Sequence, residues 1–293
     1  MPGKLKEVRN RIKSVQSTQQ ITKAMKMVSA AKLRRAQDAI IQMRPYARKL
    51  QELLQHIVQN YQGDAGRQYI TKRPVEKVLI VVITSDRGLC GAYNANLIRL
   101  AKQLIQERYA AQHARGQVYI MPIGKKGYDH FVKYKFQVIP DHWRIFHQLN
   151  FETVRQAAQT AIQGFLDQRW DVVELVYSEF KNAASQRFVA ERFLPVEPAH
   201  AASSKTHINF LFEPNEDQLI EELIPRILNT QFFKAVLDAQ ASEHGARMTA
   251  MDKASENASE ILKTLRISYN RARQAAITTE LTEIVSGASA LKG

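Results

Sequence analysis

Both ends of this 293-residue chain carry long helical patterns of apolar residues. In the N-terminal segment the apolar positions step by three and four without a break at Leu33, Ala36, Ile40, Met43, Ala47, Leu50, Leu54 and Ile57. Upstream, the same steps join Leu5, Val8, Ile12 and Val15, after which Thr18 and Thr22 interrupt the stripe before Met25. Such spacing is typical of a helix that lies along a partner helix. We therefore predict a helix over 1–61, which Pro45 should bend or loosen.

The C-terminal segment carries a second stripe, made mostly of small residues. Its members are Ala246, Ala250, Ala254, Ala258, Ile261, Leu265, Ala272 and Ala276, and it continues at Ile277, Leu281, Ile284, Ala288 and Leu291. We predict a helix over 213–293 that pairs antiparallel with 1–61 as a coiled coil, because alanines let two helix backbones approach closely. Helices of these lengths would reach about 90 and 110 Å, whereas a compact globule of this size is about 50 Å across. Part of the coil should therefore protrude.

Between the two stripes the apolar period changes. Residues 77–84 form a β-branched run suited to a strand that is buried on both faces. Further strands are expected at 118–123, 171–178, 187–195 and 207–212, and helices at 94–109, 125–133 and 151–166. Because strands alternate with helices, we predict an α/β domain over 75–212, Rossmann-like with a largely parallel sheet, inserted between the terminal helices.

The net charge of +14 is unevenly distributed. Residues 1–60 hold 13 Lys and Arg against 3 Asp and Glu, which suggests an acidic partner: nucleic acid, an anionic membrane surface or acidic protein loops. A solvated helix face is the alternative. The longest apolar run, 78–83, is too short to span a membrane, and residues 1–20 lack the apolar core of a signal peptide. The single cysteine, Cys90, rules out an internal disulfide and fits a reducing compartment, so we expect a cytoplasmic protein.

Candidate chemical sites in the middle segment are weak. The 85–91 loop lies between a predicted strand and a helix but lacks both the Gly-x-Gly-x-x-Gly spacing and a Gly-Lys-Ser/Thr ending, and the 123–127 turn has the same defect. Cys90 has no histidine close in sequence, which favours a packing role over an activated thiol. His142 and His147 with Asp141 lack the spacing of a metal site. We therefore predict no catalytic, cofactor or metal site.

The terminal segments closely resemble the gamma subunit of F-type ATP synthases. At the start, the similar stretch runs from Ile12-Lys-Ser-Val15 through Ile21-Thr-Lys-Ala-Met-Lys-Met-Val28 to Ala31-Lys-Leu-Arg34. At the end it includes Ala246-Arg-Met-Thr-Ala-Met251, Arg273-Gln-Ala-Ala-Ile-Thr-Thr-Glu280 and Glu283 to Leu291. In the middle, Ser85-Asp-Arg-Gly-Leu-Cys-Gly91 is similar too. The resemblance covers the whole chain in order.

This resemblance implies a central rotor that is itself not an enzyme and binds no cofactor. In that family the coiled coil passes up the axis of a hexamer of three alpha and three beta subunits. The α/β domain lies near the epsilon subunit and the ring of c subunits. A single copy would couple proton-driven rotation of the c-ring to conformational cycling of the beta subunits, in ATP synthesis or hydrolysis. The expected location is peripheral, at the cytoplasmic face of a bacterial inner membrane, with no nucleic acid as partner.

The resemblance also implies roles for particular side chains. Facing acidic loops of the beta subunits would be Lys23, Met25, Lys26 and Arg247. An upper contact region, hydrogen-bonded to beta, would comprise Arg273, Gln274, Thr278 and Glu280. Turning in the hydrophobic collar of the hexamer would be Ile277, Leu281, Ile284, Val285, Ala288 and Leu291. For Met25 and the apolar tail a plain coiled-coil core is the alternative, and for the lysines a solvated face.

Two other classes of function remain to be weighed against the rotor. A nucleic-acid-binding coil would use the basic N-terminal helix, but it lacks the aromatic or arginine clusters that read bases. A nucleotide-using enzyme would need the middle domain to bind ATP. Chloroplast relatives carry an extra segment with a cysteine pair, which is missing between Pro195 and His207, so we expect no dithiol switch.

Overall fold

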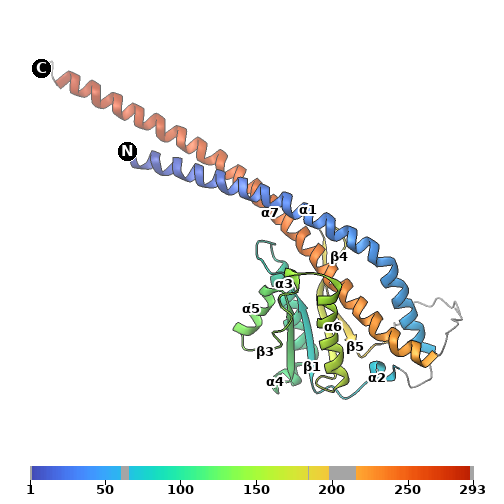
Figure 1. Cartoon of the computed structure of the whole chain (residues 1–293). Coiled ribbons are helices and arrows are strands. Elements are labelled where there is room, and N and C mark those ends of the chain that lie inside the picture. The colour runs from blue at the N-terminus through green and yellow to red at the C-terminus, as the bar shows by residue number, and fades with distance from the viewer. Residues whose placement is uncertain (1, 61–65, 184, 198–215, 291–293) are drawn as a thin grey trace. The chain divides into compact units, whose positions relative to one another are not determined.

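In the computed structural model the chain begins and ends with a very long helix, and the remaining elements lie between these two helices in the sequence (Figure 1). The structure describes residues 2–60, 66–183, 185–197 and 216–290. Helix α1 (Pro2–Asn60) continues without interruption through Pro45, and α7 (Glu216–Ala290) contains Pro225 in the same way. Both expected terminal helices are thus confirmed. None of the described helices is long and apolar enough to cross a membrane.

The chain forms two compact units whose boundaries fall inside the long helices. One unit joins Met1–Ser29 with Arg247–Gly293, and the other is Ala30–Ala246. The second unit therefore contains the last half of α1, the first part of α7 and everything between them. Our expected segments 1–61, 75–212 and 213–293 divide the chain by element type instead, and that division stays a prediction.

Five strands form one sheet in the larger unit, in the order β3-β2-β1-β4-β5. The sheet consists of β1 (Val78–Ile83), β2 (Val118–Ile123), β3 (Gln137–Val138), β4 (Val172–Phe180) and β5 (Gln186–Leu194). Strand β1 pairs in parallel with both β2 and β4, and β5 is the antiparallel edge strand. All six residues of β1 are fully buried, which confirms the expected strand with two covered faces. The strand expected at 207–212 lies outside the described residues.

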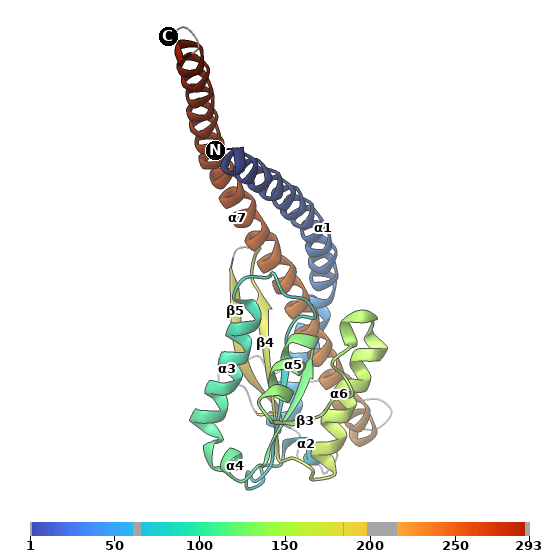
Figure 2. The same ribbon diagram turned by 90° about the vertical axis from the view of Figure 1, so that its left-hand side faces the viewer.

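Helices cover both faces of this sheet (Figure 2). Leu79, Val81 and Ile83 point to a core shared with α6 (Phe151–Leu166), the end of α1 and the beginning of α7. The alternate residues of β1 point to a second core, formed with α3 (Tyr93–Arg108) and α5 (Lys125–Lys133). Sequence reasoning missed three short helices, α2 (Arg67–Ile70), α4 (Ala110–Ala114) and η1 (Ile145–His147), and the two-residue strand β3.

The predicted N-terminal stripe is the buried face of α1 in the larger unit. Leu33, Ala36, Ile40, Ala47, Leu54 and Ile57 are each at most 5% exposed.

Close packing against Trp170 explains why residue 164 of α6 is a glycine. The Trp170 ring lies so near Gly164 that an added Cβ would be 2.0 Å from it, and the indole Nε1 donates a hydrogen bond to the Ala161 carbonyl at 2.8 Å.

Candidate functional site

The smaller unit is an antiparallel helix pair whose register is fixed by three polar contacts. Arg9 Nη2 donates to the Tyr269 hydroxyl at 3.0 Å, Gln19 Nε2 to the Ser259 hydroxyl at 2.5 Å, and Lys26 Nζ to Asp252 Oδ1 at 2.5 Å. Residue numbers therefore fall along α7 as they rise along α1. At this register the start of α1 at Pro2 is level with about Ala276 in α7.

The core of this helix pair is partly polar. Thr22 and Ser255 are 8% and 6% exposed, and their hydroxyls share a hydrogen bond of 2.7 Å. This pairing explains why Thr22 occupies a position of the apolar stripe. A buried polar pair specifies register in coiled coils at some cost in stability.

Up to Ala276, the predicted C-terminal stripe follows the inner face of α7 except at one position. Ile261, which we placed in the stripe, is 46% exposed, whereas Leu262 is 5% exposed. Ala258, a member of the predicted stripe, is 5% exposed, and so is Met251, which the stripe did not include. Ile261 and Leu262 are adjacent apolar residues, so spacing alone did not decide which of the two is buried. Ser255 takes a core position that a search for apolar residues passes over.

Beyond about Ala276, α7 has no counterpart in the described part of α1, and Figure 1 shows its end extending past the start of α1. Four apolar side chains are consequently open to solvent: Ile277 at 48%, Leu281 at 57%, Ile284 at 67% and Val285 at 63%. Ala288 is exposed too, and Leu291 lies outside the described residues. An exposed row of large apolar residues is typical of an interaction surface. Among the described residues these four have no partner helix, so they are not part of the coiled-coil core of this helix pair.

The residues expected to face acidic loops differ in exposure. Lys23 is exposed, whereas Met25 and Lys26 are half-buried. Lys26 already pairs with Asp252, and its side chain is 41% exposed. Arg247 is buried, at 8% exposed.

The four residues expected in the upper contact region are all exposed: Arg273, Gln274, Thr278 and Glu280. The Thr278 hydroxyl donates to the Gln274 carbonyl at 3.0 Å, a common contact along one helix turn. Being exposed in the described chain, the side chains of Arg273, Gln274 and Glu280 are open to a partner.

The loops at the carboxyl ends of β1 and β2 are joined by hydrogen bonds. The first three N–H groups of α5 donate to the Asp86 carboxylate at 3.0 Å, to the Ser85 carbonyl at 3.0 Å and to the Thr84 hydroxyl at 2.8 Å. Gly124, at φ 99°, allows this close approach, since an added Cβ would lie 2.3 Å from the Thr84 carbonyl oxygen. A phosphate would need these same N–H groups. These contacts hold the ends of β1 and β2 together, and they leave none of the first three N–H groups of α5 available to bind a phosphate.

Other candidate chemistry in the middle domain is structural as well. Cys90 is 2% exposed, and Asn94 Nδ2 donates to its sulfur at 3.3 Å, as the packing interpretation expects. His142 contacts Thr160 through a hydrogen bond of 2.9 Å, and burial lowers its pKa. Within the described ranges, no three His, Cys, Asp or Glu side chains are grouped so that they could hold a metal ion.

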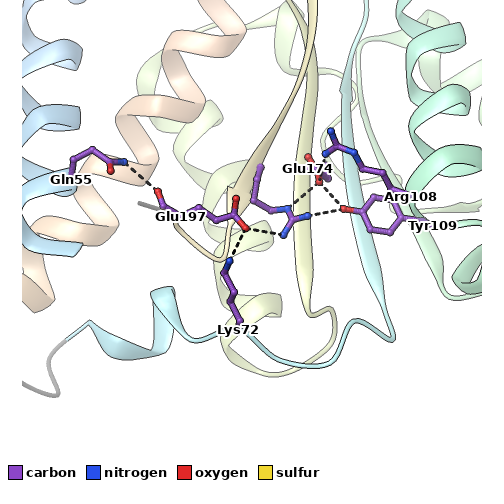
Figure 3. Close-up of polar contacts among 7 residues, drawn as sticks. Gln55, Lys72, Arg108, Tyr109, Glu174 and Glu197 are labelled. Carbon is purple, nitrogen blue, oxygen red and sulfur yellow. Dashed lines mark hydrogen bonds and ion pairs between the residues drawn. The ribbon is translucent and has the colours of Figure 1, made fainter. Parts of the chain in front are cut away.

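Sequence reasoning did not find a buried charged cluster around Glu174 (Figure 3). Glu174 on β4 is 0% exposed, accepts a hydrogen bond of 2.6 Å from the Tyr109 hydroxyl and another of 3.0 Å from Arg192 Nε, and lies 3.7 Å from Arg108 Nη1. Burial and the neighbouring carboxylate raise the pKa of Tyr109, so its proton stays in place as a donor. The partners of Glu174 are Arg108 at the end of α3, Tyr109 directly after it and Arg192 on β5. Because these residues are far from Glu174 in the sequence, no local pattern links them to it.

Comparison with known proteins identifies the family. The sequence model of the ATP-synt family, described as ATP synthase, matches residues 4–291. The chain is 50% identical to the ATP synthase gamma chain of Cytophaga hutchinsonii and 51% identical to that of Flavobacterium johnsoniae, over 99% of both chains in each case. It is an ATP synthase gamma chain by family. The gamma chain of Chlorobaculum parvum is 48% identical over 98% of this chain.

Solved structures agree with this assignment. A chain of the central stalk and c-ring of the Tetrahymena thermophila mitochondrial ATP synthase is 25% identical, covers 80% of this chain and superposes with a TM-score of 0.57. A chain of the Euglena gracilis mitochondrial ATP synthase, 23% identical, covers 99% of this chain at a TM-score of 0.66 and supports the fold. The chain is therefore a non-catalytic central-stalk subunit.

Proposed function

We propose that this chain is the rotor of its ATP synthase. It couples proton-driven rotation of a c-ring to conformational cycling of the catalytic beta subunits, in synthesis or in hydrolysis. One copy serves a hexamer of three alpha and three beta subunits, and the α/β domain contacts the epsilon subunit and the c-ring. The complex places the chain peripherally at the cytoplasmic face of a bacterial inner membrane. The observation that carries the proposal is the row of exposed apolar residues at the end of α7, which has no partner within the described chain.

The helix pair is asymmetric, as a rotor shaft has to be. Three identical sites around a symmetric shaft would receive identical contacts, and a ligand or partner that contacts all states equally shifts no equilibrium. In the smaller unit α7 is paired with α1 up to about Ala276 and continues beyond it as a single helix. The sides of this shaft therefore present different residues to the three surrounding sites. Moving a two-state site from 1:99 to 99:1 takes about 5.5 kcal/mol, which several polar and apolar contacts together can supply.

We assign the basic side chains of the pair to acidic loops of the beta subunits. Lys23 is exposed and available, and Met25 adds a half-buried apolar contact. Lys26 is bound to Asp252, so a partner carboxylate would compete with this ion pair. Arg247 would have to leave its buried position to take part.

We assign the end of α7 to two kinds of contact. Arg273, Gln274, Thr278 and Glu280 offer hydrogen bonds to beta, while Ile277, Leu281, Ile284, Val285, Ala288 and Leu291 turn in an apolar collar of the hexamer. An apolar bearing suits rotation, because hydrophobic contact is non-directional and changes little with angle.

The proposal is tested by co-expressing the chain with the alpha and beta subunits of the same organism. We expect an assembled complex whose ATPase activity depends on the chain. Replacing Arg273 and Gln274 by alanine should lower that activity at least about tenfold, since a hydrogen bond to a charged group contributes about 1.5–3 kcal/mol and 1.4 kcal/mol is a factor of about ten. Arg271→Ala, which removes another exposed arginine of the same helix, is the matched control and should retain activity. Equal activity of the double variant and the control would contradict this assignment.

A further inference from the structure

Helix α1 donates two side-chain hydrogen bonds to the backbone of the β4–β5 hairpin. Arg44 Nη2 donates to the Phe180 carbonyl at 2.8 Å, and Gln55 Nε2 donates to the Glu197 carbonyl at 3.4 Å. Phe180 ends β4, whereas Glu197 follows the end of β5, so the acceptors lie at opposite ends of the antiparallel hairpin. Arg44 and Gln55 are separated by three helical turns, or about 16 Å, and therefore lie on the same side of α1.

The Arg44 contact joins three elements. The same guanidinium nitrogen that donates to Phe180 lies 3.6 Å from Asp238 Oδ1 on α7. Asp238 is 0% exposed; burial raises its pKa above the ordinary 3.8, and the charges of Lys234 and Arg44 oppose that rise. A buried carboxylate needs a counter-charge. One arginine therefore links α1 to α7 and to the end of β4.

The residue that accepts the Gln55 hydrogen bond, Glu197, is held in place by ion pairs (Figure 3). Glu197, whose carbonyl accepts from Gln55, pairs through its carboxylate with Lys72 at 3.3 Å and Arg192 at 3.7 Å. Arg192 in turn donates to the buried Glu174. The acceptor is thus tied to the interior of the sheet by a continuous chain of ion pairs.

We propose that Arg44 and Gln55 are positioning residues that fix the angle and height of α1 on the α/β domain, so that torque applied to the domain reaches the helix without loss through rolling or sliding. The inference rests on the proposed rotor function. The apolar side chains between these contacts, such as Leu54, hold α1 to the core but do so without directional preference. Hydrogen bonds weaken steeply as their angle departs from linear, so two of them on one helix side resist rotation of the helix about its axis.

The test measures the torsional stiffness of the assembled complex. The hexamer is fixed to a surface through its beta subunits, and a bead is attached to the α/β domain through a cysteine introduced at the exposed Lys133. The angular variance of the bead is recorded during pauses at low ATP. We expect Arg44→Gln to raise this variance by about twofold or more, because the Arg44 hydrogen bond of 2.8 Å is charge-assisted and is the stronger of the two attachments, the Gln55 bond being 3.4 Å long. Arg44→Lys should give an intermediate value, since the ammonium keeps a positive charge near Asp238, but the shorter side chain does not place its nitrogen where Nη2 of Arg44 lies.

Lys49→Gln is the matched control. It removes a charge from the same helix, but Lys49 pairs only with Glu52 of α1 among the described contacts, and its side chain is 78% exposed. Should the loss of counter-charge at Asp238 prevent assembly, Arg44→Gln with Asp238→Asn removes both charges and should raise the variance to the same degree. Unchanged variance in either variant, in complexes that still rotate, would overturn the inference. A wild-type complex that hydrolyses ATP without rotating would instead refute the rotor function itself.

Discussion

Replacing Arg192 by methionine should strongly destabilise the α/β domain. The substitution leaves the Glu174 carboxylate, which is 0% exposed, without its hydrogen bond of 3.0 Å to the guanidinium. Arg108 remains 3.7 Å away, but its side chain is 57% exposed, so water screens much of its charge. Breaking a buried ion pair by removing one partner costs about 3–5 kcal/mol. Because the Tyr109 hydrogen bond stays, we expect about 3 kcal/mol, which corresponds to a fall in Tm of about 6–12 °C for a unit of this size.

Tryptophan fluorescence is the suitable assay for this substitution. Trp170 is 1% exposed in the core of the α/β domain, whereas circular dichroism would mainly report the long helices. Arg187→Met is the matched control on the same strand: Arg187 pairs with Glu179 at 3.5 Å and is 61% exposed, so its loss should cost less than about 1 kcal/mol. Arg192→Met with Glu174→Leu should recover most of the lost Tm, because the unpaired buried charge is gone. Equal Tm values for Arg192→Met and Arg187→Met would refute this reasoning.

Three further predictions concern packing, protonation and the end of α7. Gly164→Ala should lower the Tm by about 2–12 °C, since the new Cβ would lie 2.0 Å from the Trp170 ring and overpacking costs about 1–3 kcal/mol. An unchanged Tm would show that the ring moves freely. Burial, partly opposed by the charge of Asp141, lowers the pKa of His142 from 6.5, so the stability that the neutral imidazole contributes is complete above pH 6.5 and is lost as the pH falls through the lower pKa of the folded state. When Tm is measured from pH 7.5 to 5.0, it should therefore fall less in His142→Gln than in the wild type. Parallel curves of Tm against pH would contradict this prediction. Deleting 277–293 should leave the fluorescence melting of the α/β domain unchanged and weaken ATPase coupling in the assembled complex; unfolding of the domain on truncation would show that our segment boundaries are wrong.

Much of the architecture could be predicted because it depends on local patterns. The β-branched run at 78–83 could bury both faces only as a central strand, and it is the middle strand of the sheet. The unbroken steps from Leu33 to Ile57 describe the buried face of α1. In both segments large apolar side chains leave a single arrangement that keeps them from water.

The remaining features depend on residues that are far apart in sequence. Arg44 forms an ion pair with Asp238, and Glu174 binds Tyr109 and Arg192. No regular spacing in the sequence indicates either set of contacts. In the C-terminal stripe only the choice between Ile261 and Leu262 was wrong, because two adjacent apolar residues both fit a three-or-four spacing. The expected contact residues could be found only by resemblance, because an exposed lysine or isoleucine at the end of a helix looks the same in a rotor and in a solvated coil.

The central claim is that the chain turns within its complex. The most direct measurement fixes the alpha–beta hexamer through its beta subunits, attaches a bead to the α/β domain of the chain and supplies ATP. We predict unidirectional rotation of the bead that pauses every third of a turn, once for each beta subunit, and stops when ATP is removed. A complex that hydrolyses ATP at its full rate while the bead keeps a fixed angle would contradict the account.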